Sequence, residues 1–253
     1  MHVEGNSIFF ALSVTMTLMK NAQTSPLPYR IEQTRNRHSR AMISDDAIVI
    51  RLAGNLSERE ANRHVEVLVK KMAKHFFYLR SKILIDPFGA LMKDADQATI
   101  ALANGNEYSF ACIPGQHLKA SRTGNAFAVT IPPHTKKRGL HRFCWKILCQ
   151  VEYERIATLV ASINNQSVQG GIHGLKLRVA SSKWGSCSAR GVISLNPALF
   201  FTSEKILHYV IIHELAHLKH KNHSQTFWSE VERWMPDYRE PYKQPRNYRL
   251  PKL

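Results

Sequence analysis

Three histidines and a glutamate near the carboxyl end of the sequence have types and a spacing that suit metal-dependent hydrolysis. Residues 213–217 read His-Glu-Leu-Ala-His. On a helix, His213 and His217 project from the same face one turn apart, so both imidazoles can bind one metal ion. Glu214 then lies beside the ion without ligating it, and its carboxylate can take a proton from a zinc-bound water. The pattern predicts one zinc ion and a water activated for hydrolysis.

A third histidine is needed to complete this ligand set. His220 lies seven residues after His213, a rise of about 10.5 Å along a helix, which is too far for one zinc ion with bonds of about 2.0–2.1 Å. His223 follows Asn222, where a left-handed residue would end the helix and bring the next imidazole back over the first two. We therefore favour His223 as the third ligand. A different arrangement takes a glutamate from the following helix, and its candidates are Glu230 and Glu232.

The elements expected to position this site follow from the spacing of apolar residues. Ser203 precedes a helical stripe of apolar residues that ends near residue 219. Ahead of it, Leu175–Val179 and Val192–Leu195 are expected to form an antiparallel pair, with a turn-rich segment between them. Residues 140–163 predict a long helix, rich in apolar and aromatic residues.

The amino-terminal half predicts a different organisation. Residues 29–53 alternate β-compatible runs with polar turns, which suggests a hairpin, and a capping-box pattern at Ser57 begins a helix that extends to Leu79. Further strands are expected between residues 104 and 133, after which the composition changes. We therefore expect an α+β protein in three parts. They are an apolar segment over 1–24 that points to an upstream start assignment, a β-rich domain with one long helix over 25–135, and a catalytic domain over 136–253.

Composition and charge restrict the setting in which the protein works. Its 35 Lys and Arg against 19 Asp and Glu give a net charge of +16, so nucleic acids and nucleotides are plausible partners. The four cysteines are too far apart for a C-x-x-C pair and too few for a disulfide scaffold, which fits free thiols in a reducing cytoplasm. The apolar run over 7–19 is too short for a transmembrane helix, so we expect no membrane span.

A distinctive set of residues marks the carboxyl-terminal half: Lys183–Ser188, Asn196, His213–Leu218, Asn222–Ser224, Phe227, Trp228 and Pro236–Arg239. Through these residues the chain resembles the YgjP-like metallopeptidase family, which comprises zincin-like proteins akin to the SprT-like and WLM domains. The resemblance implies a zincin-like catalytic domain with a small antiparallel sheet and an HExxH active-site helix. It also implies His213, His217 and His223 as zinc ligands and Glu214 as general base, in agreement with the spacing.

The resemblance implies a metal-dependent hydrolase but does not say which kind of bond is cleaved. We expect a metallopeptidase acting on a peptide or protein, with an exposed edge of Val192–Leu195 holding the substrate in extended form. The alternative is a nucleotide (UTP-type) pyrophosphatase, in which Mg²⁺ or Mn²⁺ acts in place of zinc and the phosphates are faced by Lys183, Arg190 and Arg239. A basic nucleic-acid-associated protein with structural zinc ranks last, because structural sites are usually closed by four protein ligands.

Overall fold

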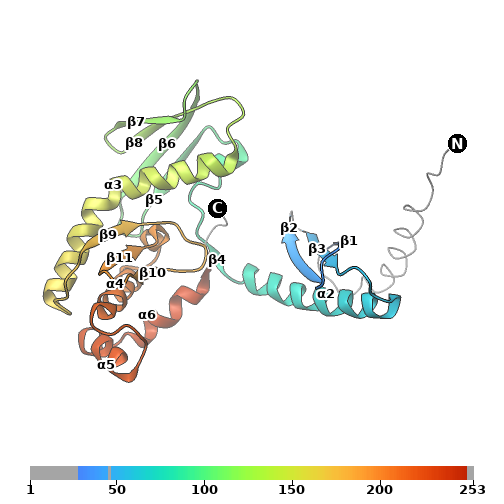
Figure 1. Cartoon of the computed structure of the whole chain (residues 1–253). Coiled ribbons are helices and arrows are strands. Elements are labelled where there is room, and N and C mark those ends of the chain that lie inside the picture. The colour runs from blue at the N-terminus through green and yellow to red at the C-terminus, as the bar shows by residue number, and fades with distance from the viewer. Residues whose placement is uncertain (1–27, 45–46, 250–253) are drawn as a thin grey trace. The chain divides into compact units, whose positions relative to one another are not determined.

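The computed structural model describes residues 28–44 and 47–249 (Figure 1). The chain divides into two compact units, residues 1–81 and 82–253. Helices and small sheets are mixed along the chain, which confirms the α+β class. None of the helices described here has the length and hydropathy needed to cross a bilayer. The apolar segment over 1–24 lies outside the described residues.

A three-stranded sheet begins the described part of the first unit. β1 (Tyr29–Gln33) pairs in parallel with β3 (Ala47–Leu52), and β2 (Arg40–Ser44) pairs antiparallel with the other side of β3. The β2–β3 pairing confirms the predicted hairpin, whose turn residues, 45–46, are not described. One face of the sheet joins a helix in a small core formed by Ile48, Ile50, Leu52, Val65 and Val69.

That helix, α2 (Glu58–Arg80), begins at the predicted capping box. The Ser57 hydroxyl accepts a hydrogen bond from the backbone of Glu60, and the Glu60 carboxylate accepts the backbone N–H of Ser57 at 2.9 Å. Two orphan donors of the first helical turn are satisfied in this way. Both the helix and its starting point therefore agree with the sequence prediction.

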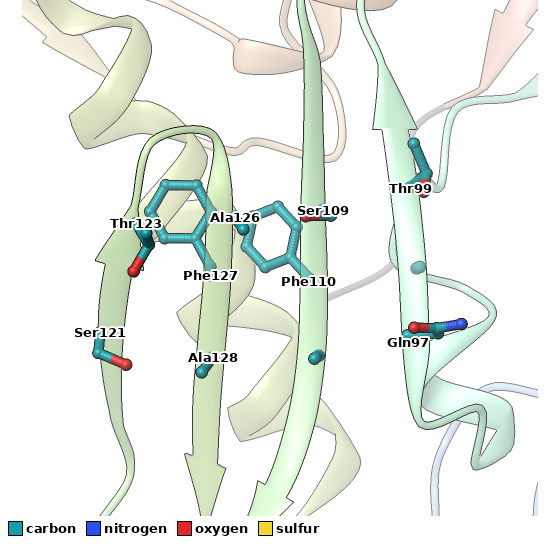
Figure 2. Close-up of a pocket in the computed structure, with 11 residues that line it drawn as sticks. Gln97, Thr99, Ser109, Phe110, Ser121, Thr123, Ala126, Phe127 and Ala128 are labelled. Carbon is teal, nitrogen blue, oxygen red and sulfur yellow. The ribbon is translucent and has the colours of Figure 1, made fainter.

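A four-stranded sheet forms the first part of the second unit, after the short strand β4 (Ile83–Leu84). Its strands are β5 (Gln97–Ala101), β6 (Glu107–Pro114), β7 (Lys119–Thr123) and β8 (Ala126–Ile131), in the order β5-β6-β8-β7. Phe110 and Phe127 pair across β6 and β8 and are buried on one face. Alternating residues on the other face line an open pocket of about 470 Å³ (Figure 2). They include Gln97, Thr99, Ser109, Ser121, Thr123, Ala126 and Ala128.

The buried face of this sheet packs against α3 (Lys137–Gln166), which the sequence predicts over 140–163. Phe88 connects the two layers, since its ring centroid lies 5.1 Å from that of Phe110 and 5.4 Å from that of Trp145. Edge-to-face packing of this kind contributes a favourable free energy in addition to that of the buried area. One continuous core therefore extends from the sheet through α3.

The domain boundary expected near residue 135 differs from the division that the structure makes. The two units meet between Ser81 and Lys82, and the sheet over 97–131 shares its core with α3. The change of composition after Pro132 and Pro133 marks a turn from strand to helix within one unit. A prolyl pair ends a strand in either setting, so the local pattern does not distinguish a turn from a linker.

A second, three-stranded sheet lies before the helix that carries the histidines. Its strands are β9 (Gly174–Leu177), β10 (Gly185–Cys187) and β11 (Val192–Leu195), in the order β10-β11-β9. The antiparallel pair predicted from the sequence is wrong, because β9 and β11 run parallel. The short strand β10 forms inside the turn-rich segment and takes the antiparallel place beside β11. The exposed edge expected for Val192–Leu195 is therefore wrong, because β11 is paired on both sides, and among the described strands the edges of this sheet are β10 and β9.

The remaining elements are mainly helical. A short 3₁₀ helix (Pro197–Phe201) begins at Asn196, whose side-chain oxygen accepts the backbone N–H of Ala198 at 3.1 Å. Three helices follow, and α4 packs against β10, β11 and α5 (Figure 1). Their bounds are α4 (Glu204–Lys219), α5 (Gln225–Trp234) and α6 (Arg239–Lys243), before the 3₁₀ helix Gln244–Asn247 and the strand β12 (Tyr248–Arg249), which pairs with β4.

Candidate metal centre

Helix α4 positions three of the four predicted site residues. Most of its apolar stripe is buried, with Ile211 and Leu215 at 0% exposure, and Leu218 at its end is half-buried, so the helix is held against the sheet. His213 and His217 lie one turn apart on the same side, and Glu214 is buried beside them at 5% exposure. The spacing argument from the sequence therefore holds for the helix in the structure.

The three histidines come together into one cluster. Their candidate ligand atoms, one from each of His213, His217 and His223, all lie within 4.8 Å of one another. The Nε2 atoms of His213 and His223 are 3.0 Å apart. Two nitrogens bound to one tetrahedral zinc ion stand about 3.3 Å apart, given bonds of about 2.0–2.1 Å. The cluster therefore fits a zinc ion after a small adjustment of side chains.

The chain reverses after α4 in a way that the sequence prediction does not capture. His220 ends the helix in an extended conformation, with φ of −120° and ψ of 109°. Asn222 was expected to be left-handed, but among the described residues the non-glycine positions with positive φ are elsewhere. Ser224 then begins α5 by accepting a hydrogen bond from the backbone of Phe227. His223 thus reaches the cluster from the short connection between two helices.

Hydrogen bonds to the far sides of the rings orient two of the imidazoles. The Tyr209 hydroxyl lies 3.2 Å from Nδ1 of His213, and the carbonyl oxygen of His220 lies 2.9 Å from Nδ1 of His217. The carbonyl oxygen can only accept, so it favours the His217 tautomer with the proton on Nδ1 and Nε2 free to ligate a metal, and the Tyr209 hydroxyl can accept the same proton from His213. Burial also lowers the pKa of His213 to about 3, with smaller contributions from His217 and His223, which keeps its imidazole neutral.

Replacing Tyr209 with phenylalanine is expected to weaken zinc binding by about tenfold or more, because partners of metal ligands contribute about 10–100-fold to affinity. The ring is retained and only the hydroxyl beside His213 is lost. Competition with a fluorescent zinc chelator measures the change. Tyr242→Phe is the matched control, since its ring packs on Tyr209 without reaching a histidine of the cluster. Equal affinity in Tyr209→Phe and the control would contradict this role.

Aromatic rings form the surroundings of the cluster. Phe227 is fully buried, and its ring centroid lies 4.9 Å from His213, 4.6 Å from His217 and 4.8 Å from His223. Trp228 stacks on His223 with centroids 5.7 Å apart. These rings exclude water from one side of the histidines and restrict their rotation.

Glu214 lies in a tight space made by strand β10. A side chain at Gly185 would place its Cβ 2.6 Å from Oε1 of Glu214, so only glycine leaves room for the carboxyl group there. Burial raises the pKa of Glu214 to about 8, against the opposing effects of the Lys183 charge and a hydrogen bond from the Cys187 backbone. A carboxyl group with such a pKa is suited to accept and release a proton near neutral pH.

Replacing Gly185 with alanine is expected to lower hydrolytic activity by about tenfold or more while zinc content stays near stoichiometric. The added methyl group displaces the carboxyl of Glu214 and leaves the histidines untouched, and small misplacements of catalytic groups are costly. Gly174→Ala is the matched control in the neighbouring strand β9, because its Cβ would meet nothing closer than 3.9 Å. Steady-state kinetics with metal analysis of each variant measures both effects, and full activity of Gly185→Ala would contradict the packing argument.

The other candidates from the sequence lie outside the cluster. Glu230 accepts hydrogen bonds from Lys219 and from the Trp234 indole, each at 3.1 Å. Glu232 lies 3.9 Å from Arg239, one of the three residues expected to face phosphates. Among the described residues, the group that could hold a metal contains neither of these glutamates, nor His220. Lys183 is another of the three basic residues expected to face phosphates, and its positive charge lowers the pKa of the Glu214 carboxyl group.

Comparison with known proteins identifies the family. The sequence matches the YgjP-like family, described as "YgjP-like, metallopeptidase domain", over residues 37–246. The chain belongs to this family. As a YgjP-like protein it is placed among the metallopeptidases, a hydrolase class that works with a catalytic metal, typically zinc, and whose substrates are peptides.

Solved structures with local similarity to this YgjP-like protein are also metallopeptidases. The metallopeptidase zymogen abylysin of Pyrococcus abyssi is 29% identical, with a TM-score of 0.33, over 37% of this chain and 98% of its own. The metallopeptidase zymogen jannalysin of Methanocaldococcus jannaschii is 26% identical, with a TM-score of 0.32, over 36% of this chain and 92% of its own. A search of curated proteins found no match.

Proposed function

We propose that this protein is a zinc-dependent peptidase with a zincin-like catalytic unit over residues 82–253. The observation that carries the proposal is the convergence of His213, His217 and His223 beside the buried Glu214. Three imidazoles would hold one zinc ion and leave a fourth position open, as catalytic zinc sites do. When bound, zinc acts as a Lewis acid that polarises a substrate carbonyl and lowers the pKa of water to about 7.

Glu214 is the proposed general base and acid. Its carboxylate takes a proton from the attacking water, and the same group then donates that proton to the leaving amine. Gly185 and the Cys187 backbone hold the carboxyl group in one place, the first by leaving space and the second by a hydrogen bond. Phe227 keeps solvent from the histidines, which strengthens the electrostatic interactions at the site.

The edge of β10 is the proposed support for the substrate. Within the described residues this strand pairs with no strand other than β11, so its outer edge lies outside the sheet, where the Cys187 backbone donates to Glu214. An extended peptide can add to such an edge through main-chain hydrogen bonds. Because Gly185 of β10 lies against Glu214, a peptide on this edge passes close to the proposed base.

Four free cysteines support a proposed location in a reducing compartment such as the cytoplasm. The structure describes Cys112, Cys144, Cys149 and Cys187 as free thiols. Burial raises the pKa of Cys144 to about 12, with a smaller effect of Cys112, so that thiol stays protonated and unreactive.

The test compares peptide and nucleotide hydrolysis by the purified full-length protein. We expect zinc-dependent cleavage of a casein peptide pool, loss of cleavage after chelation, and its return when zinc is restored. Nucleoside triphosphates, with Mg²⁺ or Mn²⁺ supplied, are the matched alternative substrates. Hydrolysis of nucleoside triphosphates without cleavage of any peptide would replace the peptidase proposal with the pyrophosphatase alternative.

A further inference from the structure

A groove of about 750 Å³ lies between α3 and the segment that leads into β10. One wall is the exposed face of α3 that carries Arg142 and Lys146, which are four residues apart and therefore project together. The opposite wall is the segment after β9, with Arg178 and Lys183 exposed on it. All four charged residues that line the groove are basic, and none is acidic.

These four basic side chains take part in none of the ion pairs that the described residues make, although the charge of Lys183 also acts on the carboxyl group of Glu214. Elsewhere in the unit, Lys137 pairs with Asp94 at 2.8 Å and Lys219 pairs with Glu230 at 3.1 Å. No ion pair of the described residues includes Arg142, Lys146, Arg178 or Lys183. Like charges facing each other across a groove are unfavourable, unless an anion lies between them.

The wall of the groove is held in place by a buried side chain. Asn196 is 2% exposed, and its amide donates hydrogen bonds to the carbonyl oxygens of Ala180 at 2.8 Å and Lys183 at 2.9 Å. The backbone of Asn196 also donates to the carbonyl of Trp184 at 2.8 Å. The segment that carries two of the four cations is therefore ordered before any ligand arrives, which lowers the entropic cost of binding.

The groove begins beside the proposed general base. Gly185 lines the groove and is also the residue against which the carboxyl group of Glu214 packs. Lys183 lines the groove and lowers the pKa of Glu214 through its charge. A chain that passes Glu214 along β10 can thus continue into the groove.

We propose that the groove binds acidic side chains of a polypeptide substrate on one side of the scissile bond. This inference rests on the proposed peptidase function and adds a substrate class to it. Carboxylates complement the four cations, and charge-assisted hydrogen bonds to lysine and arginine are the stronger kind. Single-stranded nucleic acid fits less well, because it stacks its bases on exposed aromatic rings. The two tryptophans of the groove are Trp145, which is 1% exposed, and Trp184, which packs against Tyr248.

The experiment measures binding, so that its result does not depend on cleavage. The zinc-loaded full-length Glu214→Gln variant is titrated against a fluorescent glutamate-rich peptide and against the same peptide with glutamine in place of each glutamate. We expect the acidic peptide to bind about tenfold more tightly. When Arg142→Gln and Lys146→Gln are both added to the Glu214→Gln protein, the preference for the acidic peptide over the amide peptide should fall severalfold. Lys119→Gln is the matched control, because it removes an exposed cation from β7, in the four-stranded sheet of the unit, and should leave the preference unchanged.

A charge reversal guards against a loss of binding that reflects misfolding. Arg142→Glu with Lys146→Glu should weaken binding of the acidic peptide and favour a lysine-rich peptide instead. Equal affinity for the acidic and amide peptides, or an acidic preference that survives in both double variants, would overturn the proposal. Tighter binding of single-stranded DNA in the groove, lost in the same variants, would overturn it in favour of nucleic acid. Failure of peptide cleavage by the wild-type protein is a separate result, which concerns the proposed function alone.

Discussion

Glu214→Gln is expected to lower the turnover number for peptide cleavage by about 100-fold or more while zinc content stays near that of the wild-type protein. General base catalysis contributes about 10²–10⁴-fold, and an amide cannot accept the proton. Glutamine has nearly the shape of glutamate, so the packing against Gly185 is preserved. Metal analysis by mass spectrometry together with steady-state kinetics separates binding from chemistry.

The control for Glu214→Gln is the same substitution at Glu204. This glutamate lies in the first turn of α4 and is exposed. Removing its charge costs about 0.3–1 kcal/mol of favourable interaction with the helix dipole and does not change the metal site. We expect wild-type turnover in Glu204→Gln. Unchanged turnover in Glu214→Gln would remove the proposed base, and loss of zinc from it would assign Glu214 a role in binding instead.

His217→Ala is expected to abolish stoichiometric zinc binding and, with it, peptide cleavage. Loss of one of three ligands should weaken affinity by more than the roughly 10–100-fold that outer partners contribute. The variant should also lose the rise in melting temperature that zinc gives the wild-type protein, because a ligand that binds only the folded state stabilises it. Isothermal titration with zinc and thermal melts with and without metal measure the two effects.

His220→Ala is the control for His217→Ala, and it tests the rejected ligand directly. Alanine preserves the backbone carbonyl that hydrogen bonds to the ring of His217. We therefore expect zinc binding close to that of the wild-type protein. The opposite pattern, with zinc lost in His220→Ala and kept in His217→Ala, would show that the ligand set is wrong.

The sequence predicts the residues that come together on α4 because their spacing is local. A helix of known pitch places His213 and His217 on one face whatever surrounds it, and the apolar stripe identifies that helix. Tyr209 lies four residues before His213 on the same face, so the same rule also identifies it as a neighbour of that histidine. That the histidines ligate zinc stays a prediction.

The parts that the sequence does not predict depend on contacts between distant segments. Strand β10 has three residues, Gly-Ser-Cys, with no alternation of apolar and polar side chains, and only its pairing with β11 makes it a strand. The space that Gly185 leaves for Glu214 likewise joins positions far apart in the chain. The division of the chain between Ser81 and Lys82 depends on such contacts too, because one face of the sheet over 97–131 is buried on α3 and composition does not show this.

The turn between α4 and α5 couples metal binding to the local unfolding of the end of α4. The carbonyl of His220 orients the ring of His217, and the amide of the same residue closes the last turn of α4 on Ala216 at 2.9 Å. Fraying of this turn therefore releases the orientation of one histidine and the position of His223 together. Amide hydrogens near the end of α4 should then exchange with deuterium more slowly when zinc is bound, because the ion adds to the free energy of opening this segment.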